Sequence, residues 1–355
     1  MRDLLAIPPA REAALRALAD HLPPQTGAAG RRVVLSTHIN SDGDGCGSEV
    51  ALARLLEARG YAPTIVNPTP WPDMFRFLLA GPDGPVPDQS ARGAAALREA
   101  DLLVVLDISD VKRLGTLADA VRGFTGPKLV IDHHLPSDEP PGEVVVSDTT
   151  ACATGELVYD LAQVMGAELS PEAAQAAYVA LLTDTGGFRF ANTTPRCHAV
   201  AAQLLAVGLD PEEIYRRVYA SVPPGKLHLL REALATLEVD PALGLSWISV
   251  EAGATDRHGV KSEDLDGIVE HPRSIAGTRM ALLFRDLGHG KVKVSFRSTG
   301  DVDVNALARQ FGGGGHAKAS GALIPGTLDG VRQRVVAAAR AHLTPAVEAG
   351  TGAAA

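Results

Sequence analysis

Two aspartates and a histidine crowd into one turn of the sequence. The stretch "VVLSTHINSDGDGCGSEVAL" starts as a buried strand and continues into His38, Asp42 and Asp44. Carboxylates two residues apart can reach one point from a curling loop, where mutual repulsion raises the pKa of one of them. A divalent cation removes this repulsion, and mixed imidazole and carboxylate ligands suit Mn²⁺, Fe or Zn better than Ca²⁺. Taken alone, the spacing is weak, and a solvated Asp/Gly turn is the better interpretation.

Three further polar clusters follow apolar runs in the same way. Asp107 follows "LLVVL", Asp132-His133-His134 ends "KLVIDHH", and Asp184 lies in "LLTDTGGFRF". Each has an ordinary alternative. Asp107 could cap a helix, one of the histidines could be a core residue beside a surface one, and Asp184 could form an Asx turn.

Short apolar runs alternate with helical stretches from residue 31 to about 150. The runs are "RRVVLST", "APTIV", "ADLLVVLDI", "KLVIDHH" and "EVVVSD", with a helix expected over about 47–59. Nearly continuous apolar strands between helices predict a parallel sheet covered on both faces. Such sheets place ligands beyond the carboxyl ends of their strands, where the clusters at 38–44, 107 and 132–134 fall.

Considered together, the clusters predict one metal site. Two histidines and four carboxylates would surround two divalent ions, whose charge of +4 balances the four acids, and Asp107 is the natural bridge. Two metal ions in such a site promote displacement at phosphorus and activate a water molecule. The predicted ligands are His38, Asp42, Asp44, Asp107, His133 and Asp184.

The rest of the chain divides into helical and strand-rich parts. Residues 152–238 are expected to be mainly helical, with helix starts at Ser170-Pro171 and Thr194-Pro195. Strands "LGLSWISV", "RMALLFRD" and "KVKVSFRS" follow. We therefore predict a two-domain α/β protein whose smaller C-terminal domain has a mixed sheet. The predicted divisions are an N-terminal surface helix and linker (1–30), a domain that carries the polar clusters (31–222), an interdomain helix or linker (223–242), a smaller domain (243–343) and a disordered tail (344–355).

Composition narrows the classes of function. The 355 residues carry a formal charge of −9, which argues against a protein that coats long nucleic acid. Residues 271–320 nevertheless hold eight basic and three acidic side chains, a local balance of +5 that suits a small anionic ligand or a solvated strand face. No apolar run is long enough for a membrane span, and no signal-peptide pattern is present, so a cytoplasmic protein is expected. Cys46, Cys152 and Cys197 are expected to be buried thiols.

The sequence resembles the DHH phosphoesterase family. The resemblance is carried, in the order of the family's motifs, by "THINSDGDGCGS", "VVLDISDVKRLG", "VIDHH", "TACATGEL" and "LLTDTGGFRF". "FGGGGHAKASG" at 311–321 is similar to the signature of the DHH-associated C-terminal domain. The combined resemblance covers about 31–343.

The resemblance implies roles for individual residues. His38, Asp42 and Asp107 would hold one ion, and Asp44, Asp107, His133 and Asp184 the other. Asp107, His133 and His134 would be catalytic. His134 would either contact the metal ligands without binding an ion itself or contact the scissile phosphate. Substrate would be held by His134, Arg297, Gly313, Gly314, Gly315 and His316. The glycine run alone is also compatible with a flexible loop, although its amides could cradle a phosphate that Arg297 engages bidentately.

The implied activity is phosphodiester hydrolysis with two divalent ions, Mn²⁺ being expected. The size and architecture are similar to family members that degrade very short RNA or DNA oligonucleotides to mononucleotides and dephosphorylate 3′-phosphoadenosine 5′-phosphate. Turnover of cyclic di-AMP or linear pApA, and a nucleotide-binding regulator without catalysis, are the alternatives. No membrane partner is expected, and a homodimer is compatible with the sequence.

Overall fold

The computed structural model describes residues 4–26, 30–79, 86–87, 91–261, 265, 267–315 and 317–344. His316 and the predicted tail beyond residue 344 lie outside these described residues. The chain forms two compact units that divide between Ser221 and Val222. Among the described helices, none has the length and apolar character that a membrane crossing requires.

The first unit is built on a parallel sheet. Its strands are β1 (Arg32–Ser36), β2 (Ala62–Asn67), β3 (Val86–Pro87), β4 (Leu102–Leu106), β5 (Lys128–Asp132) and β6 (Val144–Ser147). They lie in the order β3-β2-β1-β4-β5-β6, and each neighbouring pair is parallel. The order reverses between β2-β1 and β4, which is where ligands bind in open α/β sheets. The predicted parallel sheet is confirmed.

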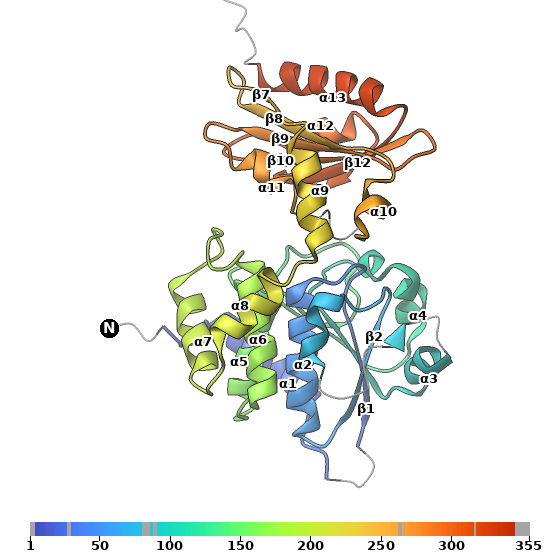
Figure 1. Ribbon diagram of the computed structural model, residues 1–355. Helices are drawn as coiled ribbons and strands as arrows, with labels where there is room; N and C mark the ends of the chain where they lie inside the picture. The colour runs from blue at the N-terminus through green and yellow to red at the C-terminus, as the bar shows by residue number, and fades with distance from the viewer. Residues whose placement is uncertain are drawn as a thin grey trace, which may run out of the picture. The chain divides into compact units, whose positions relative to one another are not determined.

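Helices cover both faces of this sheet, and Figure 1 shows them on its two sides. One face carries α1 (Pro9–Ala19), α2 (Gly43–Glu57), α5 (Thr154–Val164), α6 (Pro171–Asp184) and α7 (Pro195–Leu205). The other carries α3 (Ala91–Glu99), the 3₁₀ segment η2 (Val111–Leu117) and α4 (Ala118–Gly123). The 3₁₀ segment η1 (Asp73–Leu78) and α8 (Pro211–Tyr219) complete the unit.

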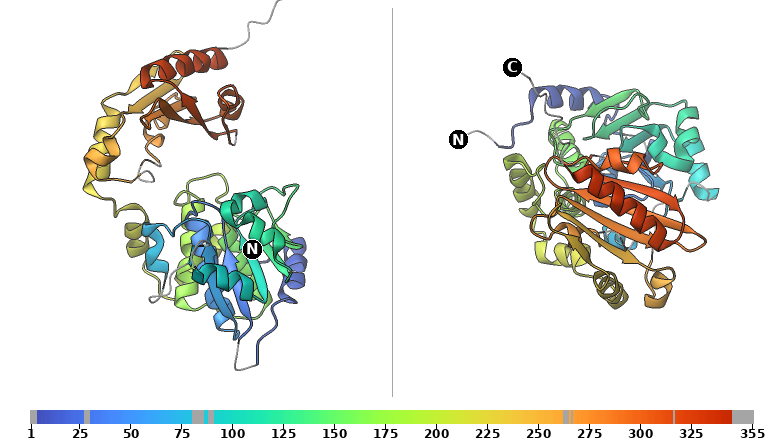
Figure 2. Two further views of the ribbon diagram at one scale, coloured as in Figure 1. Left: turned by 90° about the vertical axis from the view of Figure 1, so that its right-hand side faces the viewer. Right: turned by 90° about the horizontal axis from the view of Figure 1, so that it is seen from above.

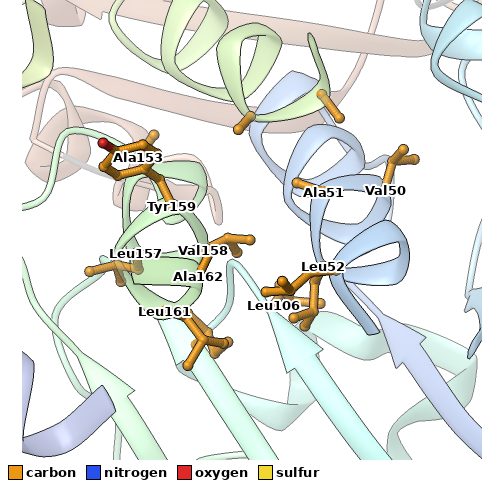
Figure 3. Close-up of a cluster of buried hydrophobic side chains, with 14 of the residues drawn as sticks. Val50, Ala51, Leu52, Leu106, Ala153, Leu157, Val158, Tyr159, Leu161 and Ala162 are labelled. Atoms are coloured by element: carbon orange, nitrogen blue, oxygen red, sulfur yellow. The ribbon is translucent and has the colours of Figure 1, made fainter. Parts of the chain in front are cut away.

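The larger core of this unit lies between the sheet and α2 and α5. Figure 3 shows side chains of these two helices on either side of Leu106, the last residue of β4. Leu52 of α2 and Leu157 and Leu161 of α5 are fully buried there. Burying a leucine side chain contributes about 1.5–3 kcal/mol, so this core fixes α2 and α5 against the strand end that precedes Asp107.

One helix prediction needs correction. The helix expected over about 47–59 begins four residues earlier, at Gly43, because the Asp42 side chain accepts from the amides of Asp44 and Gly45 and caps it. The N-terminal helix α1 has one exposed face, which includes Ala10, Ala13 and Arg16, in agreement with the expected surface helix. Its other face packs on the core, where Leu15 and Leu18 are fully buried and Arg11 is 3% exposed. Ser170 and Thr194 also cap α6 and α7 as predicted.

Helices α2 and α6 approach each other through glycine. A Cβ atom added at Gly47 would lie 2.4 Å from the Ala176 carbonyl oxygen and 3.0 Å from the Ala180 Cβ. One at Gly43 would lie 2.4 Å from the Thr183 Oγ1. This close approach brings the first turn of α2 beside the last turn of α6, where Asp44 and Asp184 lie.

The second unit is built on a mixed sheet. Its strands β7 (Glu238–Asp240), β8 (Leu245–Val250), β9 (Met280–Asp286), β10 (Lys291–Ser298), β11 (Gly314–Gly315) and β12 (Ala319–Pro325) lie in the order β11-β12-β10-β9-β8-β7. Only β8 and β9 pair in parallel among the described strands of this sheet. The predicted α/β class with a mixed C-terminal sheet is confirmed.

Helices also cover the second sheet on both faces. α12 (Val304–Arg309) and α13 (Leu328–Leu343) pack on one face, and α9 (Pro224–Leu234), α10 (Ala254–His258) and α11 (Glu270–Arg273) on the other. The second view in Figure 2 shows α13, in red, lying along the strands of this sheet. On β10 the exposed and half-buried side chains alternate with buried ones, so Lys291, Lys293 and Arg297 share one face.

The close approach of α2 and α6 generates a stability prediction. Gly47→Ala should lower the free energy of unfolding of the first unit by about 1–3 kcal/mol, because the methyl group overpacks against the α6 backbone. Gly123→Ala is the matched control, since a Cβ there meets nothing within 4 Å. Each unit contains one tryptophan, Trp71 or Trp247, so urea denaturation followed by Trp71 fluorescence in a Trp247→Phe background reports the first unit. Equal midpoints for the two alanine variants would contradict the prediction.

Candidate metal centre

Seven of the side chains singled out in the sequence meet at one edge of the first sheet. They arrive from separate segments, which are the ends of β1, β4 and β5, the first turn of α2 and the last residue of α6. They form three overlapping groups of possible metal ligands: Asp107, His133 and His134; His38, Asp42 and Asp107; and Asp44, His133 and Asp184. In each group one ligand atom per residue lies within 4.8 Å of the others.

The His133 Nε2 atom is the clearest mark of an ion position. It lies 3.5 Å from Asp44 Oδ2, 3.6 Å from Asp107 Oδ1 and 3.7 Å from Asp184 Oδ2. It is buried, and no described side chain hydrogen-bonds to it. Ligands that each lie about 2.0–2.2 Å from one ion are roughly 3–3.6 Å apart. The spacing therefore fits atoms that share a cation better than atoms that hydrogen-bond.

A second group forms around His38. Its Nε2 atom lies 3.4 Å from Asp107 Oδ2 and 3.8 Å from Asp42 Oδ1. Its Nδ1 atom lies 2.9 Å from the Ile39 carbonyl oxygen, which orients the ring with Nε2 toward the carboxylates. Metal-bound histidines are commonly oriented by such a hydrogen bond. Asp107 faces His38 with one oxygen and His133 with the other, so its carboxylate lies between the two groups.

Asp107 has an unusual backbone conformation. Its φ angle is +63°, in the left-handed region that aspartate tolerates better than most residues. Its amide donates to the Ile131 carbonyl, and its Oδ1 accepts a 3.1 Å hydrogen bond from the Thr154 hydroxyl. The carboxylate is only 2% exposed. The alternative that Asp107 is a helix cap is not seen, because Asp110 caps the following 3₁₀ segment.

Asp44 is a buried carboxylate supported by two helix starts. It lies in the first turn of α2, and it accepts from the amides of Thr154 (2.7 Å) and Gly155 (3.0 Å) at the start of α5. Ser48 donates to the same carboxylate at 3.0 Å. Helix N-termini favour negative charge, which helps to hold a carboxylate that is 1% exposed.

Burial and like charge perturb this cluster in the metal-free state. Burial and the charge of Asp107 raise the pKa of Asp44 well above its usual range. Burial also raises the pKa of Asp184 to about 6, against the opposing effect of His133. For His38 burial alone would lower the pKa, but hydrogen bonding to Asp107 and Asp42 raises it to about 10. Without a metal ion, bound protons therefore offset part of the negative charge of this cluster. A divalent cation could offset the same charge, so these residues are suited to bind one.

His134 lies beside the cluster and is partly open to solvent. Its Nδ1 atom lies 2.7 Å from Asp132 Oδ1, and this hydrogen bond raises the pKa of the ring. The same Nδ1 atom is 3.7 Å from Asp107 Oδ1. Its ring meets that of His133 edge to face, with centroids 4.5 Å apart. Since Nδ1 is engaged by Asp132, Nε2 is the atom of His134 that can serve a ligand.

The substrate-binding candidates of the second unit have their own local structure. Arg297 of β10 donates to the Phe296 carbonyl and lies 3.6 Å from Glu270. Gly314 and Gly315 form β11 and pair with β12 instead of forming a free loop. Gly313 is required by packing, because a Cβ there would lie 2.2 Å from the Gly321 carbonyl oxygen, and its amide already donates to Ala308. His316 lies outside the described residues.

Some supporting residues were not assigned roles from the sequence. Thr154 and Gly155 lie within "TACATGEL", which had marked a resemblance but no function. Asn192 donates to Asp184 Oδ2 at 3.0 Å and to the Cys152 carbonyl at 2.9 Å, and nothing in its sequence context indicated this. All three cysteines lie in the described ranges and are buried and free, as predicted.

Comparison with known proteins covers both units. Residues 32–181 match the DHH family, N-terminal domain, and residues 246–344 match the DHHA1 domain. The bifunctional oligoribonuclease and PAP phosphatase NrnA of Thermus thermophilus is 34% identical over 316 residues, which are 88% of this chain and 91% of that protein. The protein of the same name from Bacillus subtilis is 28% identical over 300 residues, covering 82% and 89%.

Solved structures show the same fold. An exopolyphosphatase-related protein from Bacteroides fragilis superposes with a TM-score of 0.84 at 28% identity, covering 94% of this chain and 98% of that one. RecJ of Thermus thermophilus, solved in complex with Mn²⁺, superposes with a TM-score of 0.55 at 18% identity, covering 96% of this chain and 55% of that one. The second likeness concerns the fold alone.

The raised pKa values of the candidate ligands predict how metal affinity depends on pH. Ligands must lose their protons to bind an ion. Because the pKa of His38 is about 10 and that of Asp184 about 6 without metal, binding at pH 7.5 should release protons, and affinity should fall from pH 8 to pH 6. Calorimetric titration of Mn²⁺ into metal-stripped protein, in buffers with different ionisation enthalpies, measures the release. A binding enthalpy independent of buffer, with constant affinity across this range, would refute it.

Proposed function

Because the chain belongs to the DHH family, we propose that it is a metal-dependent phosphodiesterase that hydrolyses very short oligonucleotides to mononucleotides. We include the removal of the 3′-phosphate of 3′-phosphoadenosine 5′-phosphate in the same proposal. Relatives that carry both activities in their names align over nearly their whole length with both units of this chain. The observation that carries the proposal is the Asp107 carboxylate, which faces His38 with one oxygen and His133 with the other.

The proposed centre holds two divalent ions, Mn²⁺ being our choice. His38, Asp42 and Asp107 would hold one, and Asp44, Asp107, His133 and Asp184 the other. When bound, such a pair polarises the phosphate and makes a water reactive enough for in-line attack. The three segments that carry Asp44, Asp107 and His133 are fixed by the sheet and by the start of α5, so the ligands are arranged before an ion arrives.

His134 and the second unit would contact the substrate. The raised pKa of the His134 ring favours its protonated form, which can donate from Nε2 to a phosphate oxygen. Arg297 can engage a terminal phosphate through its guanidinium, and we place Gly314, Gly315 and His316 in the same role. Gly313 can assist only through its backbone shape, since its amide is engaged by Ala308.

The activity can be tested on a set of defined substrates. Purified protein with saturating Mn²⁺ should convert a labelled 5′-phosphorylated dinucleotide to mononucleotides, and chelation should abolish this. Asp107→Asn should lower kcat/KM by at least about 100-fold, because it removes charge at the position between the two groups of ligands. Asp119→Asn is the control, since this aspartate is 96% exposed.

The outcome on other substrates decides between related activities. Parallel rates on cyclic di-AMP, linear pApA and 3′-phosphoadenosine 5′-phosphate measure the preference. Faster turnover of cyclic di-AMP than of any linear dinucleotide would replace the proposed substrate class. Tight dinucleotide binding without any product, in folded and metal-loaded protein, would instead indicate a regulator.

A second prediction concerns substrate affinity. Arg297→Ala should raise KM for the dinucleotide by about tenfold or more, because a charge-assisted hydrogen bond to phosphate contributes about 1.5–3 kcal/mol. Lys291→Ala is the control, because Lys291 lies on the same face of β10 but at the opposite end of the strand. Steady-state kinetics on both variants checks this. An unchanged KM for Arg297→Ala would remove that residue from the proposed binding site.

A further inference from the structure

Arg11 of the N-terminal helix is a buried arginine whose guanidinium uses all three of its nitrogens. Nε donates to Asp148 Oδ2 at 2.6 Å, and Nη1 donates to Glu156 Oε1 at 2.6 Å and to Asp160 Oδ2 at 2.9 Å. Nη2 donates to the Thr150 hydroxyl at 3.2 Å. The guanidinium therefore joins α1 to both ends of the segment 148–156, which includes the start of α5.

A second arginine reinforces the acidic side of this contact. Arg196 of α7 donates to Glu156 Oε1 and to Asp160 Oδ1, each at 2.6 Å. Glu156 and Asp160 are almost completely buried. The two arginines thus share two buried acids, Glu156 and Asp160, while Asp148 is partly exposed. Only Arg11 reaches Asp148 and Thr150, so only Arg11 spans the segment 148–156.

The same segment supplies the groups that orient the candidate ligands. The amides of Thr154 and Gly155 donate to Asp44, and the Thr154 hydroxyl donates to Asp107. The Ala151 carbonyl lies 3.4 Å from His133 Nδ1. Asn192 links the Cys152 carbonyl to Asp184.

Glu156 connects Arg11 to the segment that carries these donors. One of its carboxylate oxygens accepts from Arg11, and the other accepts from the Cys152 amide at 2.9 Å. Asp148 folds the other end of the segment by accepting from the Thr150 amide and hydroxyl. Asp148 and Glu156 therefore each pair with Arg11 and also accept a hydrogen bond from within the segment 148–156.

We propose that Arg11 is a positioning residue for the metal centre. It acts through Asp148, Thr150 and Glu156 to hold the segment 151–155 in the conformation that aims donors at Asp44 and Asp107 and a carbonyl at His133. The inference rests on the metal site of the proposed function, and it extends that site to Arg11, which lies 27 residues before the first ligand, His38. Outer partners of metal ligands commonly affect metal affinity by about 10–100-fold.

The test compares metal affinity with stability. In metal-stripped protein, Arg11→Met should raise the Kd for Mn²⁺ by about tenfold or more and accelerate hydrogen exchange at the amides of Thr154 and Gly155. Arg11→Lys should behave like Arg11→Met, because an ammonium keeps the charge but cannot bridge Asp148, Thr150 and Glu156 at once. Calorimetry gives the Kd, and exchange followed by mass spectrometry or NMR gives the protection.

Two controls separate positioning from general stability. Leu18→Ala weakens the packing of the same helix, since Leu18 is fully buried, but it leaves every hydrogen bond between Arg11 and the segment 148–156 in place. It should lower thermal stability and keep the wild-type Kd and exchange rates. Arg16→Met removes only the exposed ion pair with Glu12. It should change neither the Kd for Mn²⁺ nor the exchange rates.

The possible outcomes are distinct. Wild-type Kd and wild-type protection in a folded Arg11→Met protein would overturn the inference while leaving the proposed function intact. An equal rise in Kd for Leu18→Ala at equal loss of stability would overturn it as well. If Arg11→Met fails to fold, Thr150→Val decides, because it removes the hydroxyl that bonds to Arg11 and Asp148 but leaves the ion pairs of Arg11 in place. It should raise the Kd in the same direction. Failure of the wild-type protein to bind Mn²⁺ would remove both proposals.

Discussion

The structure depends on holding like charges together out of water. Asp44 and Asp107 are almost fully buried, and both lie close to the same nitrogen of His133. Isolated carboxylates in such surroundings are strongly disfavoured unless they are protonated, hydrogen-bonded or neutralised by a cation. The start of α5 donates hydrogen bonds to Asp44, but burial and the charge of Asp107 still raise its pKa. A divalent cation would neutralise this charge.

The parallel sheet explains why these residues meet. Strands that run in one direction place all their carboxyl ends at one edge, and the order of strands reverses between β1 and β4. His38 follows β1, Asp107 follows β4, and His133 follows β5, which are adjacent strands. Asp44 and Asp184 are added by α2 and α6, whose close contact requires glycine at positions 43 and 47. The site is thus a product of chain direction and of tight helix packing.

The supporting residues form a second layer with a logic of its own. Segment 148–156 turns at the end of β6 and starts α5, and its donors and carbonyls orient acids and a histidine from three other segments. Arg11 and Arg196 neutralise the acids that shape this segment. A helix at the start of the chain therefore contributes to a site formed by residues far from it in sequence, through buried charge rather than through direct contact.

The sequence by itself determined the α/β class, the family and the side chains that could bind metal, because these depend on local patterns. Apolar runs that end in Asp and His, helix-start signals such as Ser170-Pro171, and motif order are all readable without tertiary contacts. Only the tertiary structure decided that Gly313 serves packing and that Arg11 and Asn192 belong to the site. These features arise from contacts between segments up to about 150 residues apart, and the period of a strand or helix carries no information about which distant side chain a polar group will meet.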